Sequence, residues 1–448
     1  MNSFLEFSAF LIVFQVITLC GNLKKDTKVS IEGDRWFING KVLNAGSPAE
    51  GLLMNVRMVN AVFEDRGAEL SKFNNAFDPK QNTDHFVSMI PEYIANGINC
   101  FTISLQGGAP GYEGAVNSAF ESDGTLRVDY MERVAEVIDA CNENSCIVIL
   151  SCFYQRQHSN FSSLDGKEAI MNALKNTVLW IKKNHFRNVL LEVSNEYRHG
   201  GYKKWKDGEW LSGNEGQVDL IKLAKSLYPS LLVSTSDMGD GRSNTSLADA
   251  VDYVSIHFNN TSFENYEERI KANKKFGKPV VCNEDDKLKE VGVNALVLSV
   301  MNGCGWGYMN SRQNQSMPFK FEGVRDDTVV YKMMKKITSP GYLIDQSVYK
   351  QTSLIITYPN DGDVFRTGQR IIIKFSHLFP DPSGKFSIKI LSNSNPIGLI
   401  SDNKNQFSWQ LNEPGAIIFE ALVTDLEGNV LLRSPKVDIL VQEDAERK

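Results

Sequence analysis

The segment Asn188-Val-Leu-Leu-Glu-Val-Ser-Asn-Glu196 is a short apolar run that ends in an Asn and a Glu. A second segment, Lys278-Pro-Val-Val-Cys-Asn-Glu284, has the same form. Short runs rich in Val and Leu are typical of strands buried in a parallel sheet. Both segments are therefore predicted to be strands with a carboxylate at the C-terminal end. In a (β/α)8 barrel, these strand ends line the functional site.

The sequence around these two segments alternates between helical periodicity and short apolar runs. The predicted helix and strand pairs are 85–96 with 99–106, 129–144 with 146–153, 167–184 with 188–194, 216–227 with 231–236, 247–250 with 253–258, 264–276 with 279–283, and 293–302 with 303–309. A first strand is predicted at 51–59 and a closing helix at 326–337. Such alternation indicates a parallel sheet. We predict an α/β fold with a closed (β/α)8 barrel, because the G-x-G-x-x-G turn typical of open dinucleotide-binding sheets does not occur.

Smaller units flank the predicted barrel. Residues 34–41 have the form of a hairpin with an Asn-Gly turn, which is expected to close the N-terminal end of the barrel. After residue 337, short segments alternate apolar and polar residues, as in Ile371-Ile-Ile-Lys-Phe, and turn sequences recur between them. About seven such strands predict an immunoglobulin-like β-sandwich. The predicted organisation is a signal peptide at 1–20, a barrel domain at 30–340 and the sandwich at 350–448.

Composition and the N-terminus bear on the compartment and on partners. The net charge of −6 comes from mixed charges, so a nucleic-acid surface is not expected. The apolar stretch 10–20 has the length of a signal-peptide core, with an uncleaved anchor as the alternative. Ile17-Thr-Leu-Cys20 has the form of a lipoprotein box, which would attach a lipid to Cys20. We expect an exported monomer that is periplasmic, held at the cell surface or secreted.

The cysteines suggest no metal centre, because none of their spacings matches a zinc site. Cys141 and Cys146 bracket a turn and could pair in an oxidising compartment. Cys100, Cys152, Cys282 and Cys304 fall in predicted strands and are interpreted as small buried apolar residues.

The two glutamates point to a chemistry. In the predicted order, Glu196 closes the fourth strand and Glu284 closes the seventh, and these strands face each other across an eight-stranded barrel. A retaining glycosidase needs one carboxylic acid to protonate the leaving oxygen and one carboxylate to attack the sugar, about 5–5.5 Å apart. Both groups are side chains, so no cofactor is expected. The predicted partner is a carbohydrate substrate.

Val193-Ser-Asn-Glu196 after strand four, together with Glu284 at the end of strand seven, resembles the clan A glycoside hydrolases, family 5 and its relatives. The resemblance implies that Glu196 is the acid/base, that Glu284 is the nucleophile and that Asn195 binds the sugar 2-hydroxyl. It also implies a sugar platform at Trp306 on strand eight. The remaining residues that it implies are His257 on strand six and Arg57, which would brace the nucleophile.

Other polar residues follow predicted strands. The candidates for substrate contacts are Gln106 at the end of strand two, Tyr154 after strand three and Asp237 after strand five. Asp285 and Asp286 follow Glu284 directly and depart from the family pattern. Asp285 would be the nucleophile if the strand ended one residue later.

Two other barrel chemistries fit poorly. A metal-dependent hydrolase needs several His and Asp ligands at strand ends, and of the six His only His257 is placed there. A Schiff-base aldolase needs a buried strand Lys, and Lys278 precedes its strand. The remaining alternative is a carbohydrate-binding protein that kept the barrel and lost turnover. Both glutamates and Asn195 are present, which favours a retaining hydrolase acting on β-glycosidic bonds of a poly- or oligosaccharide.

Overall fold

The computed structural model describes residues 26–66, 77–107, 116–156, 164–345, 353–378, 386–400, 406–425 and 427–443. The predicted signal peptide and Cys20 lie outside these ranges. None of the described helices combines the length and the apolar character needed to cross a bilayer.

Eight parallel strands form a closed ring, which confirms the predicted (β/α)8 barrel. The strands are β4 (Met54–Arg57), β5 (Cys100–Ser104), β6 (Ile147–Tyr154), β7 (Val189–Asn195), β8 (Leu232–Ser234), β9 (Val254–His257), β10 (Val280–Glu284) and β11 (Trp306–Tyr308). Regular pairing runs from β11 through β4 to β8, and β9 pairs with β10. The parallel bridges Ser236–Ser255 and Val281–Gly305 close the two remaining seams. Glu196 and Glu284 therefore share one end of the ring.

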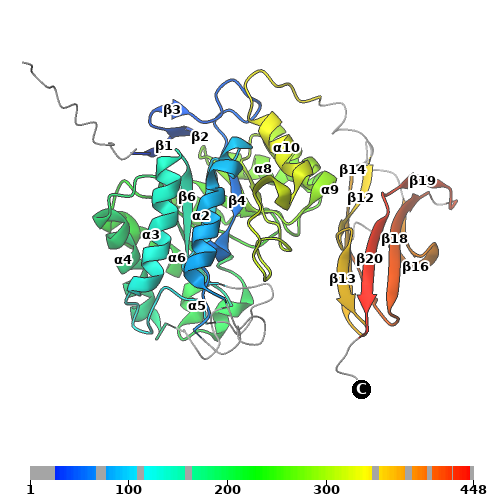
Figure 1. The fold of residues 1–448 in the computed structure, drawn as a ribbon. Coiled ribbons are helices and arrows are strands. Elements are labelled where there is room, and N and C mark those ends of the chain that lie inside the picture. The colour runs from blue at the N-terminus through cyan, green and yellow to red at the C-terminus, as the bar shows by residue number, and fades with distance from the viewer. Residues whose placement is uncertain are drawn as a thin grey trace, which may run out of the picture.

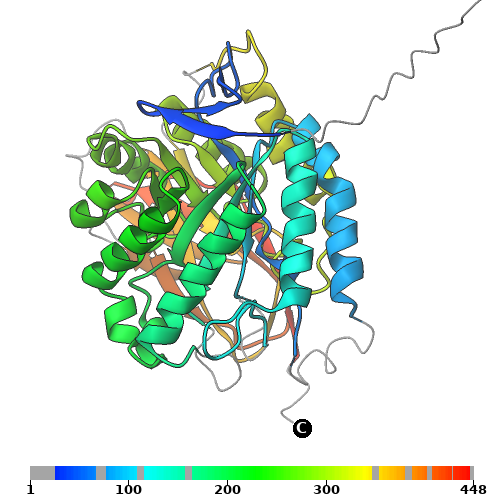
Figure 2. The ribbon, with the colours of Figure 1, turned by 90° about the vertical axis from the view of Figure 1, so that its left-hand side faces the viewer.

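Helices surround the ring and bury its outer face (Figures 1 and 2). The α-helices are α2 (Pro79–Ala95), α3 (Val128–Glu143), α4 (Lys167–Lys183), α5 (Gly208–Leu211), α6 (Asn214–Leu227), α7 (Thr245–Ala250), α8 (Tyr266–Lys274), α9 (Lys289–Met301) and α10 (Thr328–Ile337). The 3-10 turns are η1 (Val59–Val62), η2 (Gly200–Lys204), η3 (Phe263–Asn265) and η4 (Gly323–Asp326). The helix predicted at 85–96 begins earlier, at Pro79, because the Asp78 side chain caps the backbone N–H groups of Lys80 and Gln81.

An N-terminal hairpin covers the end of the barrel opposite the two glutamates. Strands β1 (Val29–Glu32), β2 (Arg35–Ile38) and β3 (Lys41–Val42) are antiparallel, and Figure 1 shows them at the top of the molecule. Asn39 and Gly40 both have positive φ, as a two-residue hairpin turn between twisted strands requires. Trp36 is buried and packs with Leu53 and Tyr253 at the N-terminal strand ends.

The C-terminal part is a β-sandwich that lies beside the barrel (Figure 1). Its strands are β12 (Ser353–Tyr358), β13 (Asp363–Arg366), β14 (Arg370–Leu378), β15 (Ser387–Ser392), β16 (Asn395–Ile400), β17 (Gln406–Gln410), β18 (Gly415–Thr424), β19 (Val430–Arg433) and β20 (Val437–Gln442). One sheet has the order β12-β14-β17, and the other has the order β13-β20-β18-β15-β16, with β19 paired to β18. Alternate residues of both sheets, such as Ile373 and Phe419, form a core separate from that of the barrel.

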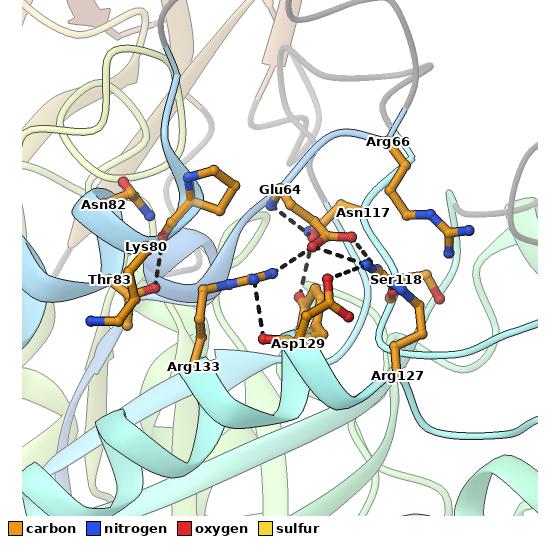
Figure 3. A network of polar contacts seen from close by, with 12 residues as sticks. Glu64, Arg66, Lys80, Asn82, Thr83, Asn117, Ser118, Arg127, Asp129 and Arg133 are labelled. Atoms are coloured by element: carbon orange, nitrogen blue, oxygen red, sulfur yellow. Dashed lines mark hydrogen bonds and ion pairs between the residues drawn. The ribbon is translucent and has the colours of Figure 1, made fainter.

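A buried ionic cluster fixes the segment that follows η1 to helix α3. Glu64 lies between Arg127 and Arg133 and forms ion pairs with both, as Figure 3 shows. The side chains of all three residues are at most 9% exposed. Asp129 pairs with Arg127 from the solvent side and is 61% exposed. The cluster thus joins two elements far apart in sequence through buried charges.

The cysteines of the described part of the chain are buried free thiols. Cys141 and Cys146 are among them, so the pairing considered for an oxidising compartment is not formed in this structure.

Candidate active site

Glu196 and Glu284 meet in one cleft at the C-terminal ends of the barrel strands. One carboxylate oxygen of each, together with a ring nitrogen of His257, lies within 4.8 Å of the others. The cleft has a volume of about 340 Å³ and is lined by both glutamates. Their side chains are 13% and 10% exposed, so both carboxylates can be reached from the cleft.

A β-bulge in β10 turns Glu284 into the cleft. The pairing with β9 skips a residue between Cys282 and Glu284, so that Glu284 pairs with His257. A bulge breaks the strict alternation of side chains between the two faces of a strand. Asn283 points into the barrel, where its amide donates to Glu192 at 3.0 Å. Because the bulge leaves one residue of β10 unpaired, Glu284 also faces inward and reaches the cleft.

Glu284 is held as an anion. Its Oε2 lies 2.9 Å from Arg57 Nε, and its Oε1 accepts a hydrogen bond from the Asn259 amide. Burial opposes ionisation, but the charges of Arg57 and His257 and the Asn259 bond outweigh it, so the pKa of Glu284 lies below its ordinary value. A carboxylate that is desolvated and yet ionised is suited to attack an electrophilic carbon.

Glu196 occupies a strained backbone position. Its φ is +46°, a region that non-glycine residues enter rarely and that is often found at functional sites. The Glu196 N–H donates to Ser236 Oγ at 3.0 Å, and its carbonyl accepts from the His199 N–H at 2.7 Å. The carboxylate accepts from Gln155 Nε2 at 3.2 Å. These anchors hold the side chain over the cleft.

His257 lies between the two carboxylates and is fully buried. Its Nδ1 is 3.4 Å from Glu196 Oε1 and 3.8 Å from Glu284 Oε2. Burial disfavours the charged ring, but Glu284 and Glu196 outweigh it and raise the pKa of His257 above its ordinary value. Both carboxylates therefore favour the protonated form of the ring that lies between them.

Arg57 and Asn195 link the two glutamates through hydrogen bonds and an ion pair. Arg57 ends β4, and its Nη2 donates to Asn195 Oδ1 at 2.9 Å while its Nε faces Glu284. Asn195 Nδ2 donates to Gln155 Oε1 at 3.1 Å, and Gln155 in turn donates to Glu196. Burial opposes the charge on Arg57, but Glu284 outweighs it and raises the pKa of the guanidinium. One hydrogen-bonded chain thus runs from the Glu284 carboxylate to the Glu196 carboxylate.

Two of the predicted contact residues line the cleft. Gln106 and Tyr154 are both in its wall, and Gln106 Oε1 accepts from the Tyr154 N–H at 3.3 Å.

Trp306 does not line the cleft, so it cannot be the predicted sugar platform in this structure. It is fully buried, its Nε1 donates to Asp285 Oδ2 at 2.9 Å, and it stacks on Tyr308. The reason is strand alternation: Trp306 and Tyr308 share the face of β11 that packs against the helices. Met309, one residue beyond the strand, lines the cleft instead.

Asp237 is also placed elsewhere. Its Oδ1 accepts from Arg198 Nε and from the Met238 N–H, and its side chain is 3% exposed. Burial raises its pKa. The neighbouring Met238 lines the cleft, so the prediction for the end of strand five was wrong by one residue.

The three consecutive acids have separate surroundings. Asp285 is fully buried and is bound by Tyr266 Oη at 2.7 Å, Trp306 Nε1 and Lys287 Nζ at 3.0 Å. It points away from the cleft, so Glu284 is the acid that faces Glu196. Asp286 is half-buried in the cleft wall, and burial raises its pKa to about 6.

The triad of Glu196, His257 and Glu284 offers three ligand atoms for a cation. However, Arg57 and Asn259 already occupy both oxygens of Glu284. A guanidinium 2.9 Å from a ligand atom repels a metal ion, which disfavours this use of the triad.

Sequence reasoning did not identify Asn259 or Lys374 as site residues. Asn259 lies two residues after His257 and directly contacts Glu284, and its position just past a barrel strand was the available signal. Lys374 lies in β14 of the sandwich and lines the same cleft. Nothing in the sequence links a sandwich strand to a barrel rim.

The barrel region is similar in sequence to a known family. A family model described as Cellulase (glycosyl hydrolase family 5) matches residues 64–333, more than half of the chain. No curated protein matches. Among solved structures, the endo-beta-1,4-mannanase from Thermotoga petrophila is 14% identical with a TM-score of 0.46, and the match covers 90% of this chain and 100% of that chain. A calcium binding mutant of Bacteroides uniformis beta-glucuronidase 2 is 10% identical with a TM-score of 0.44, covering 93% of this chain and 48% of that chain.

Proposed function

Because the chain belongs to glycosyl hydrolase family 5, we propose that it cleaves β-glycosidic bonds of a poly- or oligosaccharide with retention of anomeric configuration. Glu284 acts as the nucleophile and Glu196 as the acid/base. The observation that carries the proposal is the approach of the two carboxylates to within 4.8 Å, at a place where Glu284 is held ionised. A closest approach of this size is compatible with the short carboxyl separation, about 5–5.5 Å, at which one carboxylate attacks the sugar directly.

In the first step, the Glu284 carboxylate attacks the anomeric carbon and the bond to the leaving oxygen breaks. Glu196 gives its proton to that oxygen as the bond breaks. Arg57, Asn259 and His257 keep Glu284 anionic before the attack. Asn195 has one amide hydrogen bonded to Gln155, and its second remains for the sugar 2-hydroxyl.

In the second step, water replaces the enzyme on the sugar. The Glu196 carboxylate left by the first step takes a proton from the water, whose oxygen attacks the anomeric carbon and releases Glu284. Both displacements occur at the same carbon, so the configuration is restored. The hydrogen bonds that link Arg57, Asn195 and Gln155 keep the two carboxyl groups in the same relative position in both steps.

The test is chemical rescue of Glu284→Ala. We expect turnover to fall by more than about 10⁴-fold. Catalytic groups act together, so removal of the nucleophile alone costs nearly as much as removal of all of them. Azide should attack the anomeric carbon in place of the missing carboxylate, restore release of the aryl alcohol from activated aryl glycosides, and yield a glycosyl azide of inverted configuration. Glu196→Gln should lose more activity on poor leaving groups than on activated ones. A folded Glu284→Ala protein that azide does not rescue would contradict the nucleophile assignment.

Before the rescue experiment, the wild-type protein is assayed for release of product from a panel of 4-nitrophenyl β-glycosides and polysaccharides. We expect it to hydrolyse at least one of them. A protein that bound sugars on the panel without hydrolysing any of them would instead be a carbohydrate-binding protein.

We further propose that the protein acts outside the cytoplasm, on the grounds of the apolar segment 10–20 and the box that ends at Cys20. Radiolabelled fatty acid incorporated by the wild type but not by Cys20→Ala would support lipid attachment. Equal labelling of both proteins would contradict it.

A further inference from the structure

The sheet β12-β14-β17 of the sandwich turns its outer face to the barrel. Ile371, Ile373 and Phe375 of β14 are buried in the sandwich core, so the alternate residues face outward. Ser376, on that outer face, accepts a hydrogen bond from the Phe263 N–H of the barrel and donates to Glu264 at 3.2 Å. The contact of this face with the barrel is therefore hydrogen-bonded and specific.

A polar cavity of about 590 Å³ lies between this face and the barrel loop that follows β9. Among the described residues, its lining consists mostly of amide and hydroxyl side chains, with one ammonium and no carboxylate. The barrel contributes residues 259–262, and the sandwich contributes Thr357, Ile372, Lys374, Phe375, Gln406 and Ser408. Ile372 is 43% exposed and offers an apolar surface among the polar groups. Sugars present both hydroxyl edges and apolar C–H faces, and this lining can satisfy both.

This cavity adjoins the catalytic cleft. Asn259, Asn260 and Lys374 line both spaces. Asn259 is the residue that donates to the Glu284 carboxylate. A chain of sugar units bound across Glu196 and Glu284 can therefore extend past Asn259 into the space under the sandwich.

Lys374 stands at the junction and is available to oxygen ligands. Its ammonium donates to the Asn260 side-chain oxygen, a neutral partner. Among the described residues, no carboxylate lies within ion-pair distance of Lys374 Nζ. Burial lowers its pKa, although Asp286 partly offsets this. A partly desolvated ammonium with a single neutral acceptor has hydrogen-bonding capacity left for a ligand.

We propose that the space between the β9 loop and the sandwich is a sugar-binding subsite, in which Lys374, Gln406 and Ser408 bind units of the substrate chain beyond the cleaved bond. The sandwich is thus part of the substrate site. This inference rests on the proposed function and deepens it: the substrate is a chain of several sugars whose hydroxyl groups reach the sandwich.

The test compares 4-nitrophenyl β-glycosides that carry one sugar unit or four, using the sugar hydrolysed fastest in the panel. Wild type should show a higher kcat/KM on the longer substrate. Lys374→Ala and Gln406→Ala should each lower the ratio of the two kcat/KM values by about 10-fold, the effect of one lost hydrogen bond to a charged or well-placed group. Ser408→Trp, which fills the space, should do the same.

Lys389→Ala is the matched control, because Lys389 is exposed on a strand of the other sandwich sheet. It should keep the wild-type ratio, and circular dichroism should show that all variants are folded. An unchanged ratio in all three folded cavity variants would overturn the inference while leaving hydrolysis itself intact. Failure of the wild type on every glycoside would instead overturn the proposed function.

Discussion

The orientation of single side chains decides the chemistry of this site. Glu284, Asp285 and Asp286 are adjacent in sequence and chemically similar, yet only Glu284 faces Glu196. The bulge at Cys282–Glu284 and the three partners of Asp285 account for the difference. The low pKa of Glu284 depends on such neighbours and can be tested one bond at a time.

Asn259→Ala should move the acid limb of the kcat/KM pH profile to higher pH. The Asn259 amide stabilises the Glu284 carboxylate, and its loss raises the pKa of the nucleophile, so ionisation is completed only at higher pH. The measurement is the pH profile on an activated aryl glycoside. Gln106→Ala is the control, since Gln106 lines the cleft and has no hydrogen bond to either glutamate. An acid limb unchanged in Asn259→Ala would contradict this account.

Trp306→Phe should reduce stability rather than substrate binding. The substitution removes the donor to the buried Asp285 carboxylate and leaves a small void, at a cost of about 2–4 kcal/mol. The midpoint of urea unfolding should fall, and KM should stay within about twofold, an effect well below one hydrogen bond. A large rise in KM with unchanged stability would restore the sugar-platform interpretation.

At the scale of elements, buried ion pairs hold the segment after η1 against helix α3. The pairing of the barrel strands does not by itself position this segment. Glu64 holds the chain after η1 against α3 through Arg127 and Arg133, and Asn117 accepts from the Glu64 N–H at 3.2 Å. The Asn117 amide also donates to the Gly107 carbonyl, beside Gln106 in the cleft wall. The cluster therefore braces the rim on the side of β5.

Glu64→Gln should cost about 3–5 kcal/mol of unfolding free energy, because it leaves the buried Arg133 without its carboxylate and leaves Arg127 with more exposed partners such as Asp129. Asp129→Asn is the matched control from the same cluster. Its carboxylate is 61% exposed, so solvent screens the pair with Arg127 and the loss should stay below about 1 kcal/mol. Denaturant titration of both variants checks the prediction. Equal losses in the two would show that burial does not set the energy of this cluster.

At the scale of the whole molecule, the barrel and the sandwich, each with its own hydrophobic core, both contribute residues to one cleft. The barrel and the sandwich have distinct apolar clusters, although Ile355 of β12 packs against the barrel core, and hydrogen bonds and ion pairs also join the two. Arg312 of the barrel pairs with Asp363 and donates to the Asp361 carbonyl at 3.2 Å. Lys289 pairs with Asp361 at 3.2 Å. We expect these contacts to hold the sandwich in the position in which β14 places Lys374 at the cleft.

Arg312→Ala should therefore reduce the preference for long substrates without affecting the chemistry. We expect the four-unit to one-unit ratio of kcat/KM to fall about threefold, as for the loss of one partly exposed ion pair. Activity on the one-unit glycoside should remain within about twofold, because Arg312 lies outside the cleft lining. Arg370→Ala, an exposed arginine at the start of β14, is the control. A normal ratio in Arg312→Ala would show that these contacts do not orient the sandwich.

The sequence by itself determined the barrel, the sandwich and the two glutamates. Local rules suffice for these, since apolar runs, helix periodicity and turn residues each act over a few neighbours, as at Asn188–Glu196 and in β14. Only the tertiary structure decided which acid of three faces Glu196, that Trp306 faces the helices, that Met238 replaces Asp237, and that Lys374 joins the site. Each of these depends on a bulge, on the face of a strand or on a contact between the barrel and the sandwich. Such features are set by residues that are distant in sequence and meet only in the folded protein.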